Sequence, residues 1–258
     1  MTILDTIVAK KKEELTSLVL PTERQLDKPK QSLSKSIAST DHPLGIIAEV
    51  KKASPSKGVL LENFQPVEIA RAYEKLEVSG ISVLTDIEFF QGDPGYLTEI
   101  KKEVNIPILR KDFIIHEKQV TYSERIGADA ILLIAAILEG SHLAELHQQA
   151  TELGLDVLVE VHNEKELEKV LTHVTPSMIG VNNRNLATFE TDLTTTERLS
   201  PLMPKGVQLI SESGIHSKKD VDFLRGSKVD GLLVGEGFMK SEDKQTFLNS
   251  LFYAGDSK

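Results

Sequence analysis

Short runs of aliphatic and β-branched residues alternate along the chain with longer segments in which apolar residues recur every three or four positions. The runs are typical of buried strands, and the longer segments have the periodicity of amphipathic helices. From residue 46 onward, eight runs start 22 to 35 residues apart, which leaves room for one helix and two short loops after each strand. The predicted strands are Ile46–Lys51, Ile81–Thr85, Ile106–Lys111, Ala130–Ala135, Asp156–Val161, Met178–Asn182, Val207–Ser211 and Gly231–Val234.

Several of the intervening segments carry signals for the start or end of a helix. Pro66 suits the first turn of one helix, which we expect to end at Gly80. A second helix is predicted over residues 139–154, where four apolar residues share one face. Asn163 has a side chain suited to cap a third helix.

The segment before the first strand has its own helical pattern. The spacing of Ile3, Ile7 and Leu15 predicts an N-terminal helix, and a shorter helix is expected near Ser32–Ala38. The charged run AKKKEEL inside the first of these helices is interpreted as a solvated helical face.

Strands that alternate with helices predict parallel βαβ units. Eight such units over about 210 residues approach the usual size of a (β/α)8 barrel. An open doubly wound sheet is the alternative, but it has fewer strands and a glycine fingerprint in its first turn, which KKASPSKG lacks. We therefore predict an α/β fold, a (β/α)8 TIM barrel over residues 46–258 with an N-terminal helical extension over residues 1–45, in a single domain overall.

Composition excludes several other classes of protein. The 258 residues contain no cysteine, so disulfides and thiolate metal sites are excluded, and a net charge of −9 argues against nucleic acid as the main partner. The longest apolar run, Ala130–Leu138, is far too short to span a bilayer, and the N-terminus lacks the apolar core of a signal peptide. The seven histidines show no metal-ligand spacing. We expect a cytoplasmic protein without a membrane partner or a metal.

Four predicted strands begin apolar and end polar on one face. Alternate residues of a strand share a face, and the C-terminal ends of barrel strands form the active-site mouth. The polar residues on these faces are Glu49 and Lys51, Lys111, Glu160, Asn182 and Arg184. One charge at a strand end is usually a solvated terminus, but four strands with the same trend favour a shared pocket. Two lysines and two glutamates in such a pocket can supply acids and bases.

The seventh and eighth predicted strands end in the glycine-containing stretches LISESG and LLVGEG. Loops at these two places commonly bind phosphate in barrels, because glycine lets backbone N–H groups approach the oxygens and a following helix N-terminus adds a favourable dipole. A phosphate site is therefore predicted at Gly214 and Gly235.

Eight motifs in order over residues 46–240 resemble those of the indole-3-glycerol phosphate synthase family of tryptophan biosynthesis. They are IIAEVKKASPSKG, SVLTDIEFFQGD, PILRKDFIIHEKQV, ADAILLIAAIL, VLVEVHNEKEL, IGVNNRNLATFETDL, LISESGI and GLLVGEGFM. The resemblance implies a carbon–carbon lyase that needs no cofactor. It converts 1-(2-carboxyphenylamino)-1-deoxyribulose 5-phosphate, a phosphosugar-anthranilate substrate, to indole-3-glycerol phosphate, CO2 and water. A monofunctional monomer is expected.

The resemblance also implies roles for individual residues. By this resemblance, Lys111 is expected to be the general acid at the substrate carbonyl, and Glu160 is expected to be its proton-handling partner. Lys51 and Glu49 are expected to form a second acid/base pair. The residues implied in substrate binding are Ser54, Phe90, Phe113, Asn182, Arg184 and Glu212, and those implied in phosphate binding are Lys51, Ser213, Gly214, Gly235 and Glu236.

Two of these assignments depend on orientation. Strand alternation puts Glu212 on the face opposite to Ser211 and Ser213, so its place in the pocket requires the strand to end before it. A carboxylate beside a phosphate is unfavourable, so Glu236 is expected to bind through its backbone N–H while its side chain points to solvent.

Two other functions are weighed against this one. A phosphosugar isomerase of the same pathway would need only one acid and one base, which leaves half of the charged cluster unexplained. A phosphometabolite sensor on a barrel scaffold would not need acid/base residues on four strands.

Overall fold

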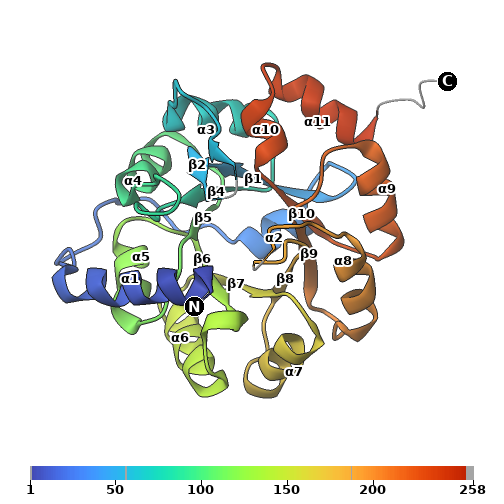
Figure 1. Cartoon of the computed structure of the whole chain (residues 1–258). Coiled ribbons are helices and arrows are strands. Elements are labelled where there is room, and N and C mark those ends of the chain that lie inside the picture. The colour runs from blue at the N-terminus through green and yellow to red at the C-terminus, as the bar shows by residue number, and fades with distance from the viewer. Residues whose placement is uncertain (1, 56, 187, 254–258) are drawn as a thin grey trace.

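Eight parallel strands close into a barrel in the computed structural model, which describes residues 2–55, 57–186 and 188–253 (Figure 1). The barrel strands are β1 (Gly45–Val50), β4 (Gly80–Leu84), β5 (Ile108–Lys111), β6 (Ala130–Ile134), β7 (Asp156–Val161), β8 (Met178–Asn182), β9 (Gln208–Glu212) and β10 (Gly231–Val234). Each strand pairs with the next along the chain, and β10 pairs with β1. The predicted (β/α)8 barrel is confirmed, and every predicted strand lies within two residues of the observed one.

Helices surround the barrel and cover its outer face (Figure 1). They are α3 (Pro66–Lys75), α4 (Pro94–Glu103), α5 (Glu117–Arg125), α6 (Gly140–Glu152), α7 (Glu164–His173), α8 (Thr194–Leu199), α9 (Lys218–Gly226), α10 (Glu236–Lys240) and α11 (Lys244–Phe252). The predicted cap is confirmed, because the Asn163 side chain accepts the N–H of Glu166 at the start of α7. Helix α3 begins at Pro66 as predicted but ends five residues before Gly80, since Glu77 takes a left-handed φ of 56° that breaks the helix.

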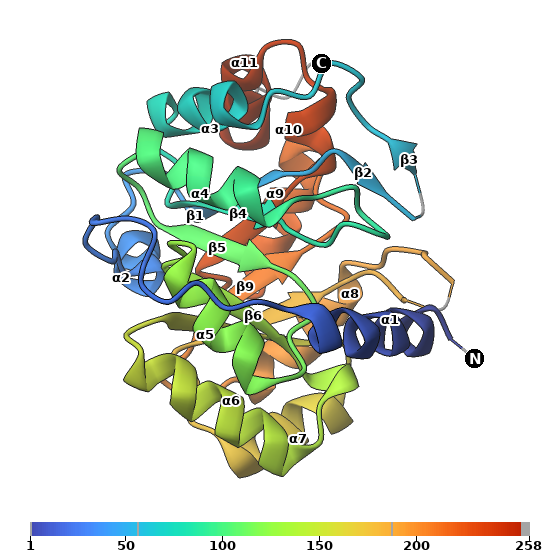
Figure 2. The same ribbon diagram turned by 90° about the vertical axis from the view of Figure 1, so that its left-hand side faces the viewer.

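The short helix α2 (Leu33–Ala38) closes the N-terminal end of the barrel (Figure 2). Leu33 and Ile37 are fully buried against inward-facing side chains of the strands, such as Ile47 and Met178. Gly80 makes this possible, because a Cβ there would lie 2.5 Å from the Leu33 side chain. The first part of the chain is therefore packed into the barrel core.

Helix α1 (Ile3–Ser17) lies at the opposite end of the barrel, on the side toward which the strands point (Figure 2). A capping box between Thr2 and Asp5 starts the helix. The interpretation of AKKKEEL as a solvated face is wrong at Lys11, which is only 3% exposed. Its Nζ lies 2.7 Å from an oxygen of Asp86 and 3.1 Å from one of Asp112. Lys11 is one turn after the buried Ile7, so it belongs to the face of α1 that meets the barrel.

A small hairpin follows β1 and was not predicted. Its strands β2 (Ala53–Ser54) and β3 (Gly58–Val59) pair antiparallel at the mouth of the barrel (Figure 2). It is too short for a periodic pattern to reveal it. Within the described ranges, no helix has the length and apolar character needed to cross a membrane.

Candidate active site

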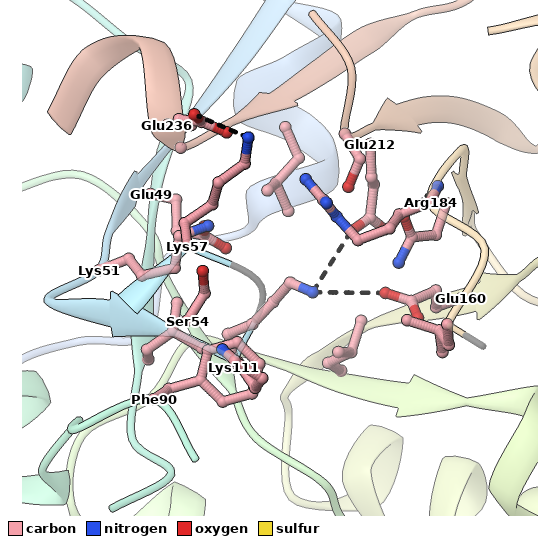
Figure 3. A pocket seen from close by; sticks show the side chains of 18 of the residues that line it. Glu49, Lys51, Ser54, Lys57, Phe90, Lys111, Glu160, Arg184, Glu212 and Glu236 are labelled. Carbon is pink, nitrogen blue, oxygen red and sulfur yellow. Dashed lines mark hydrogen bonds and ion pairs between the residues drawn. The ribbon is translucent and has the colours of Figure 1, made fainter. Parts of the chain in front are cut away.

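A pocket opens at the C-terminal mouth of the barrel (Figure 3). Its lining includes all fourteen residues that the sequence predicts for the site: Glu49, Lys51, Ser54, Phe90, Lys111, Phe113, Glu160, Asn182, Arg184, Glu212, Ser213, Gly214, Gly235 and Glu236. Strand alternation had placed six of these residues together, namely Glu49, Lys51, Lys111, Glu160, Asn182 and Arg184, and the other eight came from the glycine-containing strand ends or from the family resemblance.

Lys111 lies at the centre of the pocket, where its Nζ contacts two buried carboxylates (Figure 3). The nitrogen is 3.3 Å from Glu160 Oε2 and 3.4 Å from Glu212 Oε2. Burial disfavours the ammonium, but the charges of Glu212, Glu160 and Glu49 outweigh it and raise the pKa of Lys111 above its usual value. The lysine is therefore charged at neutral pH and is held as a hydrogen-bond and proton donor.

Glu212 points into the pocket, which corrects the expected orientation of this strand end. β9 runs through Glu212, and the side chain of Ser211 faces outward, where it bonds with Asn183 and Thr196. Gly180 on the neighbouring strand makes room, because a Cβ there would overlap the Glu212 carboxylate. The register pairs Glu212 with Asn182, which was assigned to the inward face, so knowledge of the register would have given the correct orientation.

The two carboxylates beside Lys111 have opposite pKa shifts. Burial, together with the charges of Glu160 and Glu49, raises the pKa of Glu212 to about 7 despite the contact with Lys111. One of its oxygens, Oε1, has no hydrogen-bond partner among the described residues. Burial also opposes the charge on Glu160, but Lys111, His162 and a hydrogen bond with Asn182 lower its pKa below the usual value. A proton that reaches this pair near neutral pH is therefore held on Glu212.

Glu49 and Lys51 form an ion pair on the adjacent wall, as their shared strand face predicted. Glu49 is 5% exposed, and the carboxylate accepts a hydrogen bond from the Lys51 ammonium. Gly235 leaves the space that this pair occupies, because a Cβ there would overlap the Glu49 carboxylate and lie 3.0 Å from Lys51 Nζ. This glycine therefore has a packing role besides any role in a phosphate loop.

One side of the pocket is apolar. The rings of Phe90 and Phe113 lie 6.0 Å apart at 37°, and Ile3, Leu4 and Ile7 of α1 also line the cavity. The contribution of α1 was not predicted, since nothing local in the sequence shows where an N-terminal helix docks.

The residues predicted to bind phosphate also line this pocket. Ser213 and Gly214 both take left-handed φ angles, of 68° and 80°, and both residues line the pocket. The Glu236 side chain is partly exposed, and its place beside the predicted phosphate loop stays a prediction. It is 19% exposed and pairs with Lys240 at 2.6 Å. It also pairs with Lys57 at 3.8 Å (Figure 3). These two lysines offset a carboxylate that would otherwise repel an anion.

A second charged cluster lies on the outer side of the same strand end. Arg110 donates to Asp112 at 2.7 Å and to Thr85 at 3.0 Å, and Asp112 also meets Lys11. The Asp86 carboxylate, the other partner of Lys11, accepts the backbone N–H groups of Phe89 and Phe90. The cluster therefore ties α1 to the loops that carry two pocket residues, Phe90 and Phe113.

Within residues 2–55, 57–186 and 188–253, no group of three or more histidine, aspartate or glutamate side chains is arranged to hold a metal ion. The expectation that no cofactor is needed stays a prediction.

Comparison with known proteins agrees with this geometry. The family described as indole-3-glycerol phosphate synthase matches residues 4–251. The chain belongs to the indole-3-glycerol phosphate synthase family. An indole-3-glycerol phosphate synthase of Shouchella clausii is 48% identical over 250 residues, which cover 97% of each chain. One of Bacillus licheniformis is 48% identical over 97% of this chain and 98% of its own, and one of Geobacillus thermodenitrificans is 47% identical over 98% of both.

The family predicted from the motifs is therefore confirmed, and with it a carboxy-lyase of tryptophan biosynthesis. A solved chain of a designed cube-shaped protein cage has a similar fold, with a TM-score of 0.57 at 11% identity over 81% of this chain and 72% of its own. That likeness concerns the fold alone.

Proposed function

We propose that this pocket converts 1-(2-carboxyphenylamino)-1-deoxyribulose 5-phosphate to indole-3-glycerol phosphate, with Lys111 as the general acid that starts ring closure. The observation that carries this assignment is the position of the Lys111 ammonium, between two buried carboxylates at the centre of the pocket. Protonation of Glu212 removes one of these charges, which lowers the pKa of Lys111 and makes it a better proton donor.

The first steps follow from this arrangement. Lys111 protonates the substrate ketone while the ring carbon that bears the carboxylate attacks it, which leaves a positive charge on the aromatic ring. Glu160 lies beside Lys111 and is charged, so it stabilises that cation until CO2 leaves and aromaticity returns.

The dehydration that follows needs an acid for the departing hydroxyl and a base for a ring proton. We assign these tasks to the ion pair of Lys51 and Glu49, which faces the same pocket from β1. The two lysines belong to different strands, so each step has its own donor.

The remaining residues are proposed to hold the substrate in a folded, reactive shape. Asn182 and Arg184 would bind the anthranilate carboxylate, and Phe90 with Phe113 would contact the aromatic ring. The residues proposed for the phosphate are Lys51, Ser213, Gly214, Gly235 and the backbone N–H of Glu236, with Ser54 on the hairpin as a further substrate contact.

We also propose that residues 1–45 and the barrel over 46–258 act as one domain, since Leu33 and Ile37 belong to the barrel core and α1 lines the pocket. A monomer in the cytoplasm is the proposed working form, and sedimentation at micromolar concentration checks the monomer.

The test is turnover of this substrate, followed by the fluorescence of the indole product. Lys111→Ala should lower kcat by about 10² or more, the scale of lost acid catalysis, while the fold survives. Lys218→Ala is the control, because that lysine pairs with Asp222 on exposed α9. Near-normal turnover by Lys111→Ala would remove this residue from the mechanism, and binding without turnover by the unaltered protein would favour a sensor.

A further inference from the structure

The reaction takes up one proton per turnover. The substrate gains two protons on oxygen, one at the ketone and one at the departing hydroxyl. It releases one proton, from the ring carbon beside the nitrogen. The C–C bond to the carboxylate breaks with its electron pair returning to the ring, so CO2 leaves without taking a proton. With the substrate carboxylate ionised, one proton must therefore enter from solvent before the next cycle.

A line of buried titratable groups leads away from Lys111. Glu160 uses Oε2 toward Lys111 and its other oxygen, Oε1, toward His162 Nε2 at 3.3 Å, an ion-pair distance at which the buried Nε2 makes no hydrogen bond to the described residues. The second ring nitrogen, Nδ1, is 3.0 Å from Glu166 Oε2. Both nitrogens of one imidazole thus contact carboxylates, and such a ring can gain a proton on one side while it loses one on the other.

The exposure of these groups rises along the line. The side chain of Glu160 is 2% exposed, that of His162 is 13% exposed and that of Glu166 is 16% exposed. His162 is absent from the lining of the candidate active site, but it lines an adjoining cavity of about 580 Å³ together with Glu166. Asn182 and Arg184 line both cavities, so the contact between Glu160 and His162 crosses a wall between them.

His162 is surrounded mostly by acidic groups. Glu160 near the end of β7, Glu166 on α7 and Glu212 on β9 act on it. The other charged residues around the adjoining cavity are Arg184, Glu190, Asp192 and Arg198. Burial disfavours the imidazolium, but the hydrogen bond to Glu166 and the three carboxylates outweigh it and raise the pKa of His162 above its usual value. The ring therefore keeps its second proton to a higher pH than a free imidazole does.

We propose that His162 and Glu166 form a proton relay that reloads the Lys111–Glu160 pair from the adjoining cavity after each turnover. A small rotation of the imidazolium directs Nε2–H at Oε1 of Glu160, which takes the proton as the N–H bond breaks. The carboxyl group of Glu160 then turns and passes the proton to the neutral amine of Lys111. The His162 ring keeps its proton on Nδ1, and a turn about the Cβ–Cγ bond brings its bare nitrogen to the adjoining cavity, where it takes a proton from Glu166 or from water before the ring turns back. Each transfer moves one proton, and no oxidant or further reactant is needed.

The inference rests on the proposed roles of Lys111 and Glu160, but it can fail without them. A purely structural role of His162 would be to hold α7 on β7. The backbone already supplies that connection, because the His162 N–H donates to Glu166 Oε2 at 2.8 Å whatever the side chain is.

The experiment compares His162→Gln, which keeps a polar side chain but cannot titrate, with the unaltered protein between pH 6 and pH 9. kcat should fall by about 10-fold or more at pH 9, where solvent protons are scarce, and by less at pH 6, with KM within twofold. Glu166→Gln should show the same trend with a smaller loss, and it serves as the second variant if His162→Gln does not fold. His147→Gln, a histidine of α6 outside both cavities, is the matched control.

A second measurement uses His162→Ala, whose missing ring leaves space beside the adjoining cavity. Added imidazole should restore kcat in proportion to the imidazolium concentration. The relay is overturned if kcat of His162→Gln is unchanged at pH 9, if it falls equally at every pH, or if imidazole has no effect on His162→Ala.

These outcomes separate the relay from the proposed function. Lys111→Ala should lose activity at every pH, without a response to imidazole. An inactive Lys111→Ala beside a fully active His162→Gln rejects the relay and leaves the proposed function intact.

Discussion

Three consecutive residues at the end of β5 enter two buried charge clusters that follow opposite electrostatic rules. Arg110 and Asp112 point outward into what we call the outer cluster, formed by Lys11, Asp86, Arg110 and Asp112. Lys111 points inward into the inner cluster, formed by Glu49, Lys51, Lys111, Glu160 and Glu212. The outer cluster has two buried charges of each sign, and the more exposed Glu14 also pairs with Lys11 at 2.9 Å. The inner cluster has three carboxylates for two ammonium groups.

The pKa shifts reflect this difference. Burial opposes the charge on Asp112, but Arg110, Lys11 and the hydroxyl of Thr85 outweigh it and hold its pKa far below the usual range. In the inner cluster the same burial prevails at Glu212 and raises its pKa to about 7. A balanced cluster stabilises the fold, whereas an unbalanced one keeps a group that can change its protonation state near neutral pH. The comparison suggests that the outer cluster serves stability and the inner one serves chemistry.

The largest expected effect on stability is in the outer cluster. Asp112→Asn leaves Lys11 and Arg110 buried with too little negative charge, so unfolding free energy should fall by about 3 kcal/mol or more. Denaturant unfolding at pH 7 measures it, and Asp222→Asn on exposed α9 is the control. A loss below about 1 kcal/mol would show that the outer cluster does not hold the fold.

Lys11→Met tests the same cluster from the side of α1. Its partners keep other contacts, Arg110 for Asp112 and two backbone N–H groups for Asp86, so we expect a smaller loss of about 2 kcal/mol. KM should rise more than kcat falls, because α1 contributes only the apolar side chains Ile3, Leu4 and Ile7 to the pocket lining. Lys10→Met is the matched control, since Lys10 is the preceding residue and its side chain is 40% exposed. Equal effects of the two variants would contradict the anchoring role.

The sequence predicted these two clusters unequally. Alternation along β5 was enough to place Lys111 inward. A strand has only two faces, and Lys111 lies on the same face as the apolar Leu109. The outer cluster was missed because Lys11 comes from a helix far along the chain, and a buried lysine has the same local pattern as a solvated one. Glu212 was misoriented for a related reason, since its face depends on the register with β8, and register is a property of two strands.

Glu212→Gln should act on stability in the opposite direction to Asp112→Asn. The folded protein holds a proton on Glu212 up to about pH 7, whereas an unfolded glutamate loses it near the usual value of 4.5. The folded state therefore binds more protons between these pH values, and stability falls as pH rises through this window. The glutamine variant avoids the penalty, so it should be more stable by about 2 kcal/mol at pH 8, with no difference below about pH 4.5. Unfolding curves at both pH values check this, and a loss of stability at pH 8 would contradict it.

The smallest expected change in stability concerns Glu49 and Lys51, the partners of the inner cluster that contact one another. If they closed the barrel end as a structural pair, removing one would strand the other and cost several kcal/mol. Lys51 is 17% exposed and faces an open pocket, so a stranded partner can be solvated. We therefore expect Glu49→Gln and Lys51→Met each to lose most activity while unfolding free energy changes by no more than about 1 kcal/mol. Steady-state kinetics and denaturant unfolding on both variants measure the two quantities together. Large destabilisation with turnover intact in the folded fraction would show that this pair stabilises the fold, as the outer cluster does. Only Lys111, Glu160 and Glu212 would then remain as candidates for the chemistry.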